Sequence, residues 1–397
     1  MALRYGFLST YPPTQCGLAT FTAALHKQLT GPVAGGSSGV VRLLDRPGTA
    51  VSPQTAPIAV VGELVAGTRD GPARAARLLN RFDVVVVQHE YGVYGGRDGD
   101  EVLAVLHDLN VPVIVVLHTV LVHPTRHQRH VLEAVAAAAA AVVVMTETAR
   151  VRLVAGYRVD PRAVSVIPHG ADDNRADDNR TALSVRAGRP TVLTWGLIGP
   201  GKGIEWGIAA MAALTDLVPA PRYLVAGETH PKVLAREGTA YRDSLAAQAR
   251  QLGVTGSVVF DARYLDAASL AEMVRGADVI LLPYDSRDQV TSGVLIEAVA
   301  AHKPIVATRF PHAVELLGDG VGLLVPHRDP AAIATAVRSV IGDNGIARGL
   351  VRAAAARAPE LLWPTVADRY RQLAAGLIAR TGSGMTDRPA AAVTATL

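Results

Sequence analysis

Short runs of apolar, mostly β-branched residues recur along the chain and alternate with longer stretches of helical pattern. Most of these runs are continuously apolar, which is typical of strands buried on both faces of a parallel sheet. Strands that alternate with helices indicate βαβ units and doubly wound α/β layers. Beyond a short strand within residues 1–9, we predict strands at residues 84–87, 113–117, 142–144, 164–167, 191–195, 222–226, 257–260, 278–282 and 304–307.

A polar segment separates the two groups of strands and contains the sequence Ala-Asp-Asp-Asn-Arg twice in tandem, at 171–175 and 176–180. Such a duplication is more typical of a tolerant linker than of a binding repeat. After the second group, an amphipathic pattern that includes Trp363 and Tyr370 predicts a closing helix. We therefore expect an N-terminal domain at 1–170, a linker at 171–190, a C-terminal domain at 191–360, a helix crossing back to the N-terminal domain at 361–380, and a disordered tail at 381–397.

Composition narrows the class of protein. The 397 residues suffice for two domains, and 49% hydrophobic with 19% charged residues is typical of a globular protein. A net charge of +4 is too small to indicate nucleic-acid binding, but it suits anionic small substrates. The single cysteine, Cys16, fits a reducing compartment, and the longest apolar stretch, 134–145, is shorter than the ~18 residues that span a bilayer. We expect a cytoplasmic protein, with peripheral membrane contact left open.

The most informative segment is 281–298, which reads as an apolar strand, a polar loop and a helix that begins near Thr291-Ser292-Gly293. Free backbone N–H groups and the positive end of the helix dipole favour a diphosphate at such a point. Glu297, one turn further on, is placed to accept hydrogen bonds from sugar or ribose hydroxyls. Adjacent phosphate and polyol sites are what a nucleotide sugar requires.

A second glycine-rich segment, 196–203, follows a predicted strand and contains Lys202. It superficially matches a phosphate-binding P-loop, but Gly203 stands where that loop needs Ser or Thr to hold Mg²⁺. An NTPase is therefore disfavoured, whereas a plain connecting turn remains an alternative. We predict that Lys202 faces the diphosphate.

Four features in this order resemble family 4 retaining glycosyltransferases: Val166-Ile167-Pro168-His169-Gly170, Trp195-Gly196 with Gly201-Lys202-Gly203, the helix that contains Glu297, and Trp363 in the closing helix. The resemblance extends from about residue 3 to 378. It implies the GT-B fold, in which two Rossmann-like α/β domains face a central cleft. It also implies transfer of a hexosyl group, glucose or mannose, from a UDP or GDP sugar to an acceptor hydroxyl, with retention and with no metal or other cofactor.

The chain departs from the family pattern at three places. Gln289 stands where relatives have a glutamate, Thr291-Ser292-Gly293 replaces Gly-Phe-Gly, and Leu197 replaces an arginine. Gln289 can still hydrogen-bond a sugar hydroxyl but carries no charge. Lys202 is then the only cation of its motif.

The resemblance assigns roles to individual residues. Lys202 and the N–H groups of Ser292, Gly293 and Val294 would stabilise the departing diphosphate. His118 would lie against the sugar, although a structural histidine at a strand end is the alternative. The catalytic candidates are thus His118, Lys202 and Gln289, of which Gln289 would contact the sugar. The remaining donor-binding candidates are Glu297 for the ribose unless it is a carboxylate on the helix surface, Gly17 and Gly201 for the diphosphate, and Tyr264 for the base unless it is a plain surface aromatic.

Polar residues near the ends of N-terminal strands are candidates for acceptor or sugar binding, with loop-capping roles as the alternative: Gln15, His89 and Glu90. The acceptor class stays open and includes carbohydrates, lipids and polyols. Other GT-B chemistry, as in nucleotide-sugar epimerases or phosphorylases, and a catalytically silent sugar-nucleotide binding subunit remain alternatives to glycosyl transfer.

Overall fold

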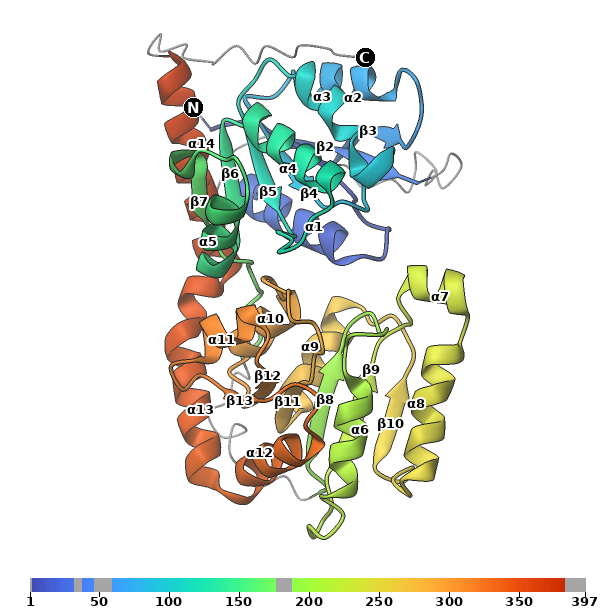
Figure 1. Cartoon of the computed structure of the whole chain (residues 1–397). Coiled ribbons are helices and arrows are strands. Elements are labelled where there is room, and N and C mark those ends of the chain that lie inside the picture. The colour runs from blue at the N-terminus through green and yellow to red at the C-terminus, as the bar shows by residue number, and fades with distance from the viewer. Residues whose placement is uncertain (1, 32–37, 46–58, 176–187, 383–397) are drawn as a thin grey trace.

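The computed structural model describes residues 2–31, 38–45, 59–175 and 188–382. These residues form two α/β domains, each built on one sheet, with helices on both faces of each sheet (Figure 1). The strand order is β3-β2-β1-β4-β5-β6-β7 in the first sheet and β10-β9-β8-β11-β12-β13 in the second. Every described pair of neighbouring strands in both sheets is parallel, as the apolar runs predict.

The first sheet and its helices span the N-terminal part of the chain. Its strands are β1 (Tyr5–Ser9), β2 (Ser38–Leu44), β3 (Val60–Val65), β4 (Val84–His89), β5 (Val113–Leu117), β6 (Ala141–Val144) and β7 (Val164–Val166). The helices are α1 (Gly17–Thr30), α2 (Gly71–Leu79), α3 (Val102–His107), α4 (Arg126–Ala138) and α5 (Glu147–Gly156).

The second sheet follows the same plan. Its strands are β8 (Thr191–Trp195), β9 (Arg222–Ala226), β10 (Val258–Asp261), β11 (Val279–Leu282), β12 (Ile305–Thr308) and β13 (Leu323–Val325). The helices are α6 (Ile204–Ala212), α7 (Pro231–Glu237), α8 (Ala240–Gln251), α9 (Ala267–Gly276), α10 (Gly293–Ala300), α11 (Pro311–Leu317), α12 (Pro330–Gly342), α13 (Asn344–Arg357) and α14 (Trp363–Gly382).

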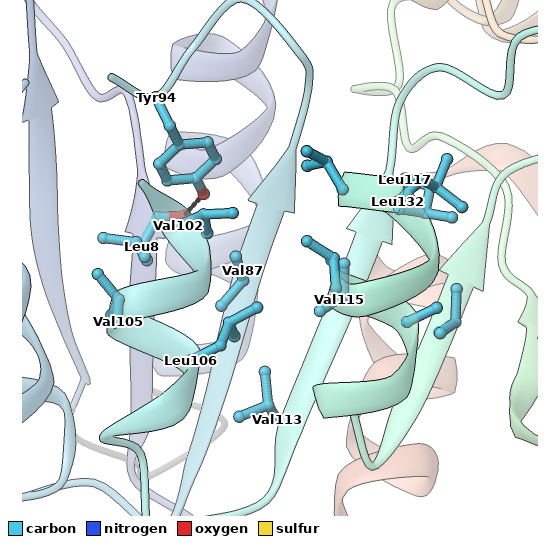
Figure 2. Close-up of a cluster of buried hydrophobic side chains, with 14 of the residues drawn as sticks. Leu8, Val87, Tyr94, Val102, Val105, Leu106, Val113, Val115, Leu117 and Leu132 are labelled. Carbon is cyan, nitrogen blue, oxygen red and sulfur yellow. Dashed lines mark hydrogen bonds between the residues drawn. The ribbon is translucent and has the colours of Figure 1, made fainter. Parts of the chain in front are cut away.

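Each sheet is buried on both faces because successive side chains of a strand point to opposite sides. In β4, Val85 and Val87 join a core with α2, α3 and α4, whereas Val84 and Val86 join a core with α1 and α14. Figure 2 shows the first of these cores, in which the hydroxyl of Tyr94 lies near the carbonyl oxygen of Leu8. The same hydroxyl donates to the Gln88 carbonyl at 2.7 Å. This double burial is why the runs are continuously apolar.

The last helix, α14, packs on the N-terminal domain although it follows the second domain in sequence (Figure 1). Val366, Tyr370 and Leu377 lie in the same core as Tyr5 and Phe7. The apolar positions of its amphipathic pattern therefore form its contact with the first domain.

All ten predicted strands are present, with bounds within a few residues of those expected, but three others were not predicted: β2, β3 and β13. In β2 the apolar run is broken by Arg42, which is buried and forms an ion pair with Glu63 on the neighbouring β3. The strand β13 has only three residues. Residues 176–187 of the predicted linker and 383–397 of the predicted tail lie outside the described residues. Within the described ranges, no helix is both long and apolar enough to cross a bilayer.

Candidate functional site

A cleft of about 960 Å³ lies between the two domains and is lined by residues of both. On the N-terminal side it is bordered by residues that follow β1, β4 and β5, and on the C-terminal side by residues that follow β8, β9, β10 and β11. Ligands of parallel α/β sheets gather at such carboxyl ends. The two domains therefore present their binding edges to each other.

Four hydrogen bonds in the described part of the chain join the domains around this cleft. The carboxylate of Glu315 on α11 accepts the first amides of α5, from Glu147 at 2.7 Å and Thr148 at 2.8 Å. Arg152 donates to the Asp288 carbonyl at 2.8 Å, and Lys232 donates to the Gly92 carbonyl at 3.3 Å. These contacts hold the two walls of the cleft opposite each other.

On the C-terminal wall, Lys202 lies in a glycine-rich turn after β8. The conformation of this turn requires glycine at position 203. Gly203 has a φ of +64°, and a Cβ there would come within 1.8 Å of the Pro283 carbonyl oxygen. The turn leaves the Lys202 ammonium 4.3 Å from the centre of the Tyr284 ring, a cation–π contact. No carboxylate in the described part of the chain forms an ion pair with this ammonium, so it can bind an anion.

The start of α10 differs from the sequence expectation at Ser292. Its amide donates to Nδ1 of the buried His312 at 2.8 Å, and its hydroxyl accepts from the Leu295 amide at 3.3 Å. The Ser292 amide is therefore already used and does not face the cleft. Gly293 and Val294, the first two residues of the helix, do line the cleft.

His169, at the end of the N-terminal domain, packs against this helix start. A Cβ added to Gly293 would come within 3.0 Å of His169 Nε2, so the glycine permits a close approach of the two domains. His169 Nδ1 donates to the Gly170 carbonyl at 2.7 Å. Burial lowers the pKa of His169 to about 4, which keeps the ring neutral at ordinary pH.

Glu297 lies in the second turn of α10 and lines the cleft. The indole N–H of Trp195, at the end of β8, donates to its carboxylate at 3.2 Å. Burial, together with the negative charge of Asp172, raises the pKa of Glu297 to about 7. A carboxyl group with free lone pairs in a cleft can accept hydrogen bonds from a diol.

On the N-terminal wall, His118 follows β5 and is held by two contacts. Its Nε2–H donates to the Gln88 side-chain oxygen at 2.7 Å, and its ring lies edge-on to Phe21 of α1, with 5.1 Å between centroids. Burial is the main cause that lowers the pKa of His118 to about 3. The ring is therefore a neutral group with Nδ1 left as an acceptor.

Glu90 and Thr119 form the second polar group of this wall. The Thr119 hydroxyl donates to one carboxylate oxygen of Glu90 at 2.5 Å, and the Tyr91 amide donates to the other at 3.1 Å. Burial raises the pKa of Glu90 above its usual range, although these hydrogen bonds and Lys232 act in the opposite direction. Both residues line the cleft.

The structure brings most of the sequence candidates to one cleft: Gly17, Glu90, His118, Lys202, Tyr264, Gln289, Gly293, Val294 and Glu297. Within this group Gln289 uses its amide N–H₂ to donate to the Thr291 carbonyl at 3.0 Å.

Four candidates lie outside the cleft lining, and the structure corrects their expected placement. Gln15 is exposed beside it, and Gly201 is exposed, with its carbonyl accepting from the Asp285 amide at 2.9 Å. His89 is 1% exposed and lies behind the wall, where neither ring nitrogen has a partner. Ser292 is turned toward His312, as described above. Strand ends alternate inward and outward, which explains why Glu90 reaches the cleft and its neighbour does not.

Sequence reasoning missed several residues of the cleft, among them Asp172, Trp195 as the partner of Glu297, Glu228 and His230. Trp195 and His169 belong to motifs that the sequence shows, but the sequence does not show which side chains they contact. Glu228 and His230 follow β9, where no glycine-rich motif marks the strand end in the sequence. Among the described residues, no three His, Cys, Asp or Glu side chains are grouped as a metal site requires.

Two family models match the chain and together cover most of it. The model described as Glycosyltransferase Family 4 matches residues 49–175, and the model described as Glycosyl transferases group 1 matches residues 189–343.

Curated relatives match over part of their length. The D-inositol 3-phosphate glycosyltransferase of Segniliparus rotundus is 30% identical over 233 residues, which are 57% of this chain and 50% of the relative. The glycogen synthase of Mycobacterium tuberculosis is 32% identical over 212 residues, which are 53% of this chain and 48% of that protein. The chain thus spans about half the length of these relatives.

Solved structures match nearly the whole chain. The structure of HepE from Anabaena with UDP has a TM-score of 0.74 at 17% identity and covers 94% of this chain and 100% of HepE. The sucrose-phosphate synthase of Thermosynechococcus elongatus has a TM-score of 0.71 at 20% identity, with coverage of 95% and 99%. At these identities the likeness shows the fold, which is GT-B. With both family models in chain order on that fold, the chain belongs to the family 4 glycosyltransferases.

Proposed function

We propose that the chain transfers a hexosyl group, glucose or mannose, from a nucleoside diphosphate sugar to an acceptor hydroxyl, with retention and without a metal ion. The observation that carries this proposal is the convergence of Lys202, the first residues of α10 and Glu297 on one cleft. A cation and helix amides suit the diphosphate, and the carboxyl group one turn further suits the ribose. HepE structures contain UDP and UDP-glucose, which supports a nucleotide-sugar donor.

In this mechanism the acceptor oxygen attacks the anomeric carbon from the face that the diphosphate leaves. The bond between the anomeric carbon and the diphosphate oxygen breaks, and its electron pair departs with the diphosphate through an oxocarbenium-like state. The acceptor proton passes to an oxygen of the departing phosphate. Lys202 and the amides at the start of α10 would stabilise the negative charge that develops there.

The N-terminal wall would contribute orientation and no positive charge. His118 and His169 are neutral, so neither competes with Lys202 for the diphosphate. The Nδ1 atom of His118 is an acceptor and would orient a hydroxyl of the transferred sugar. A cytoplasmic location goes with this proposal, since the single cysteine fits a reducing compartment.

The test is a thermal-shift screen of the chain with UDP, GDP and ADP, their hexose conjugates and the matching nucleosides. Ligand that binds only the folded state raises the apparent stability, by about 2.7 kcal/mol at a hundred times the dissociation constant. We expect one nucleotide series to raise the melting temperature and its nucleoside to have little effect. The bound donor is then incubated with acceptors in EDTA, and NMR reads the anomeric configuration of the product.

Retention in EDTA is the expected result. Inversion, or dependence on added metal, would contradict the corresponding part of the proposal. Tight donor binding with neither hydrolysis nor transfer would instead favour a catalytically silent binding subunit. Gln289 and Leu197, which are uncharged where relatives have charged residues, are the observation behind this alternative.

A further inference from the structure

The charges that line the cleft are unevenly distributed. Lys202 is the only lysine or arginine among the described residues that line it. The carboxylates of the lining are Glu90, Asp172, Glu228, Asp266, Asp288 and Glu297. A cleft of this composition has one strong site for an anion, and the proposed donor diphosphate occupies it.

The N-terminal wall, where the acceptor would bind under the proposed function, carries no positive charge in its described part. Its two lining histidines, His118 and His169, stay neutral at ordinary pH because burial lowers the pKa of each ring to about 3 and about 4. The remaining lining side chains of this wall are apolar or uncharged apart from Glu90, and include Leu18, Phe21 and Val120. A phosphate on the acceptor would therefore find no counter-charge on this wall.

Glu90 is the acidic group of this wall, and in its ionised form it repels an anionic ligand. Its carboxylate is anchored by the Thr119 hydroxyl at 2.5 Å and the Tyr91 amide at 3.1 Å, so it cannot swing away from an anionic ligand without losing both bonds. Each carboxylate oxygen keeps a second lone pair for a hydroxyl donor. Thr119, which donates to Glu90, keeps lone pairs of its own for the same hydroxyl-bearing ligand.

Lys232 is the cation that interacts electrostatically with Glu90, but it is already engaged. Its ammonium donates to the Gly92 carbonyl at 3.3 Å, and it is not part of the cleft lining. It therefore partly compensates the charge of Glu90 from an exposed position on α7 and does not line the cleft.

From this distribution we infer that the acceptor is a polyhydroxyl compound without phosphate or carboxylate, and that Glu90 and Thr119 bind its hydroxyls. This inference rests on the proposed function, because it describes the second substrate of the same cleft. Discrimination works by repulsion as well as attraction: juxtaposed like charges reject the anionic analogue, while hydroxyl hydrogen bonds select the neutral one.

The experiment uses the full chain, its identified donor and matched acceptor pairs: myo-inositol with inositol 3-phosphate, glucose with glucose 6-phosphate, and fructose with fructose 6-phosphate. Transfer and donor hydrolysis are measured together. We expect kcat/KM to be about 10-fold or more higher for the uncharged member of each reactive pair, as the cost of facing like charges suggests.

A preference for the phosphorylated member of any pair would overturn the inference. Donor hydrolysis with no transfer to any uncharged acceptor would also count against it, yet would leave the proposed donor site standing. Absence of both donor binding and hydrolysis would instead remove the proposed function itself, so the two failures are distinguishable.

A variant assigns the discrimination to Glu90. Glu90→Gln keeps the size of the side chain, and loss of a charged hydrogen-bond acceptor is expected to lower kcat/KM for the neutral acceptor about 10- to 100-fold, with donor KM unchanged. The ratio between neutral and phosphorylated acceptors should fall, a change that a merely structural role would not cause.

Two further variants complete the test. Thr119→Val removes the hydroxyl but keeps the charge, so it should lower acceptor affinity while the discrimination against phosphate persists. Glu272→Gln, at an exposed position of α9, is the matched control and should change neither value. An unchanged acceptor profile in a folded Glu90→Gln protein would overturn the assignment.

Discussion

The two walls of the cleft differ in the charge of their polar groups. The C-terminal wall keeps groups that can carry charge: Lys202 with no ion-pair partner in the described chain, and Glu297 with a pKa raised to about 7. The N-terminal wall keeps its histidines neutral by burial, with the pKa of His118 and His169 well below the usual range. One wall suits a diphosphate and a ribose, whereas the other suits uncharged hydroxyls.

The two walls also differ in how far apart in the sequence their residues lie. Lys202 and Glu297 come from two contiguous motifs, 196–203 and 281–298, in which loop and helix start are neighbours in sequence. The N-terminal wall collects side chains that follow three separate strands, β1, β4 and β5, together with His169. Its electrostatic character therefore arises from packing and not from any local motif.

The largest expected effect is the loss of turnover when Lys202 is replaced. Replacing Lys202 with alanine removes the only lysine or arginine of the described lining, and we expect kcat to fall about 10²- to 10³-fold, as for loss of one preorganised group at developing charge. Steady-state kinetics with the identified donor measure this. Lys27→Ala, at an exposed position of α1, is the matched control. Near-normal turnover in a folded Lys202→Ala protein would exclude the assigned role.

The next effect concerns the ionisation of Glu297. Since its pKa is raised to about 7, the group is largely protonated at pH 6 and largely ionised at pH 8. The ionised form is the stronger acceptor for ribose hydroxyls, so donor affinity should rise as the pH rises through 7. Glu297→Gln should weaken donor binding about 10- to 100-fold at pH 8 and flatten this dependence.

Calorimetric titration of donor binding at pH 6, 7 and 8 tests whether Glu297 causes this pH dependence. Glu360→Gln, at an exposed position before α14, serves as the control and should keep the wild-type pH profile. If Glu297→Gln retains the same rise with pH, another group titrates in that range.

The smallest expected effect is on stability and concerns the contact between Gly293 and His169. Gly293→Ala places a Cβ about 3.0 Å from His169 Nε2, and we expect a loss of about 1 kcal/mol in the free energy of unfolding from overpacking. Gly349→Ala, inside α13 with no atom within 4 Å of the added Cβ, should instead gain about 0.5–1 kcal/mol. Denaturant unfolding compares them, and equal gains in both would mean that His169 does not press on α10.

The sequence predicts the fold better than it predicts the site. Valine-rich runs such as 84–87 are unambiguous because burial on both faces leaves no polar position in a strand. The strand β2 is not predicted because Arg42 interrupts its apolar run, and the ion pair with Glu63 on the neighbouring β3 explains that residue.

Within the site, contacts decide what motifs leave open. Ser292 lies in the predicted phosphate motif, yet its amide bonds His312, twenty residues further on. His89 and Glu90 are adjacent in sequence, but one is buried behind the wall and the other lines the cleft. The Trp195–Glu297 bond joins two motifs that the sequence shows separately. Such pairings depend on how β8 and α10 pack, which no local pattern contains.

We infer above all that Lys202 and the start of α10 bind one diphosphate, across from a wall whose described lining holds no lysine or arginine. Calorimetry of the nucleoside diphosphate, the monophosphate and the nucleoside, with wild type and Lys202→Ala, tests it most directly. We expect the second phosphate to strengthen binding to the wild type by roughly 10- to 100-fold, as a charge-assisted contact would, and Lys202→Ala to lose most of this gain. The same gain in both proteins, or no gain in the wild type, would contradict it.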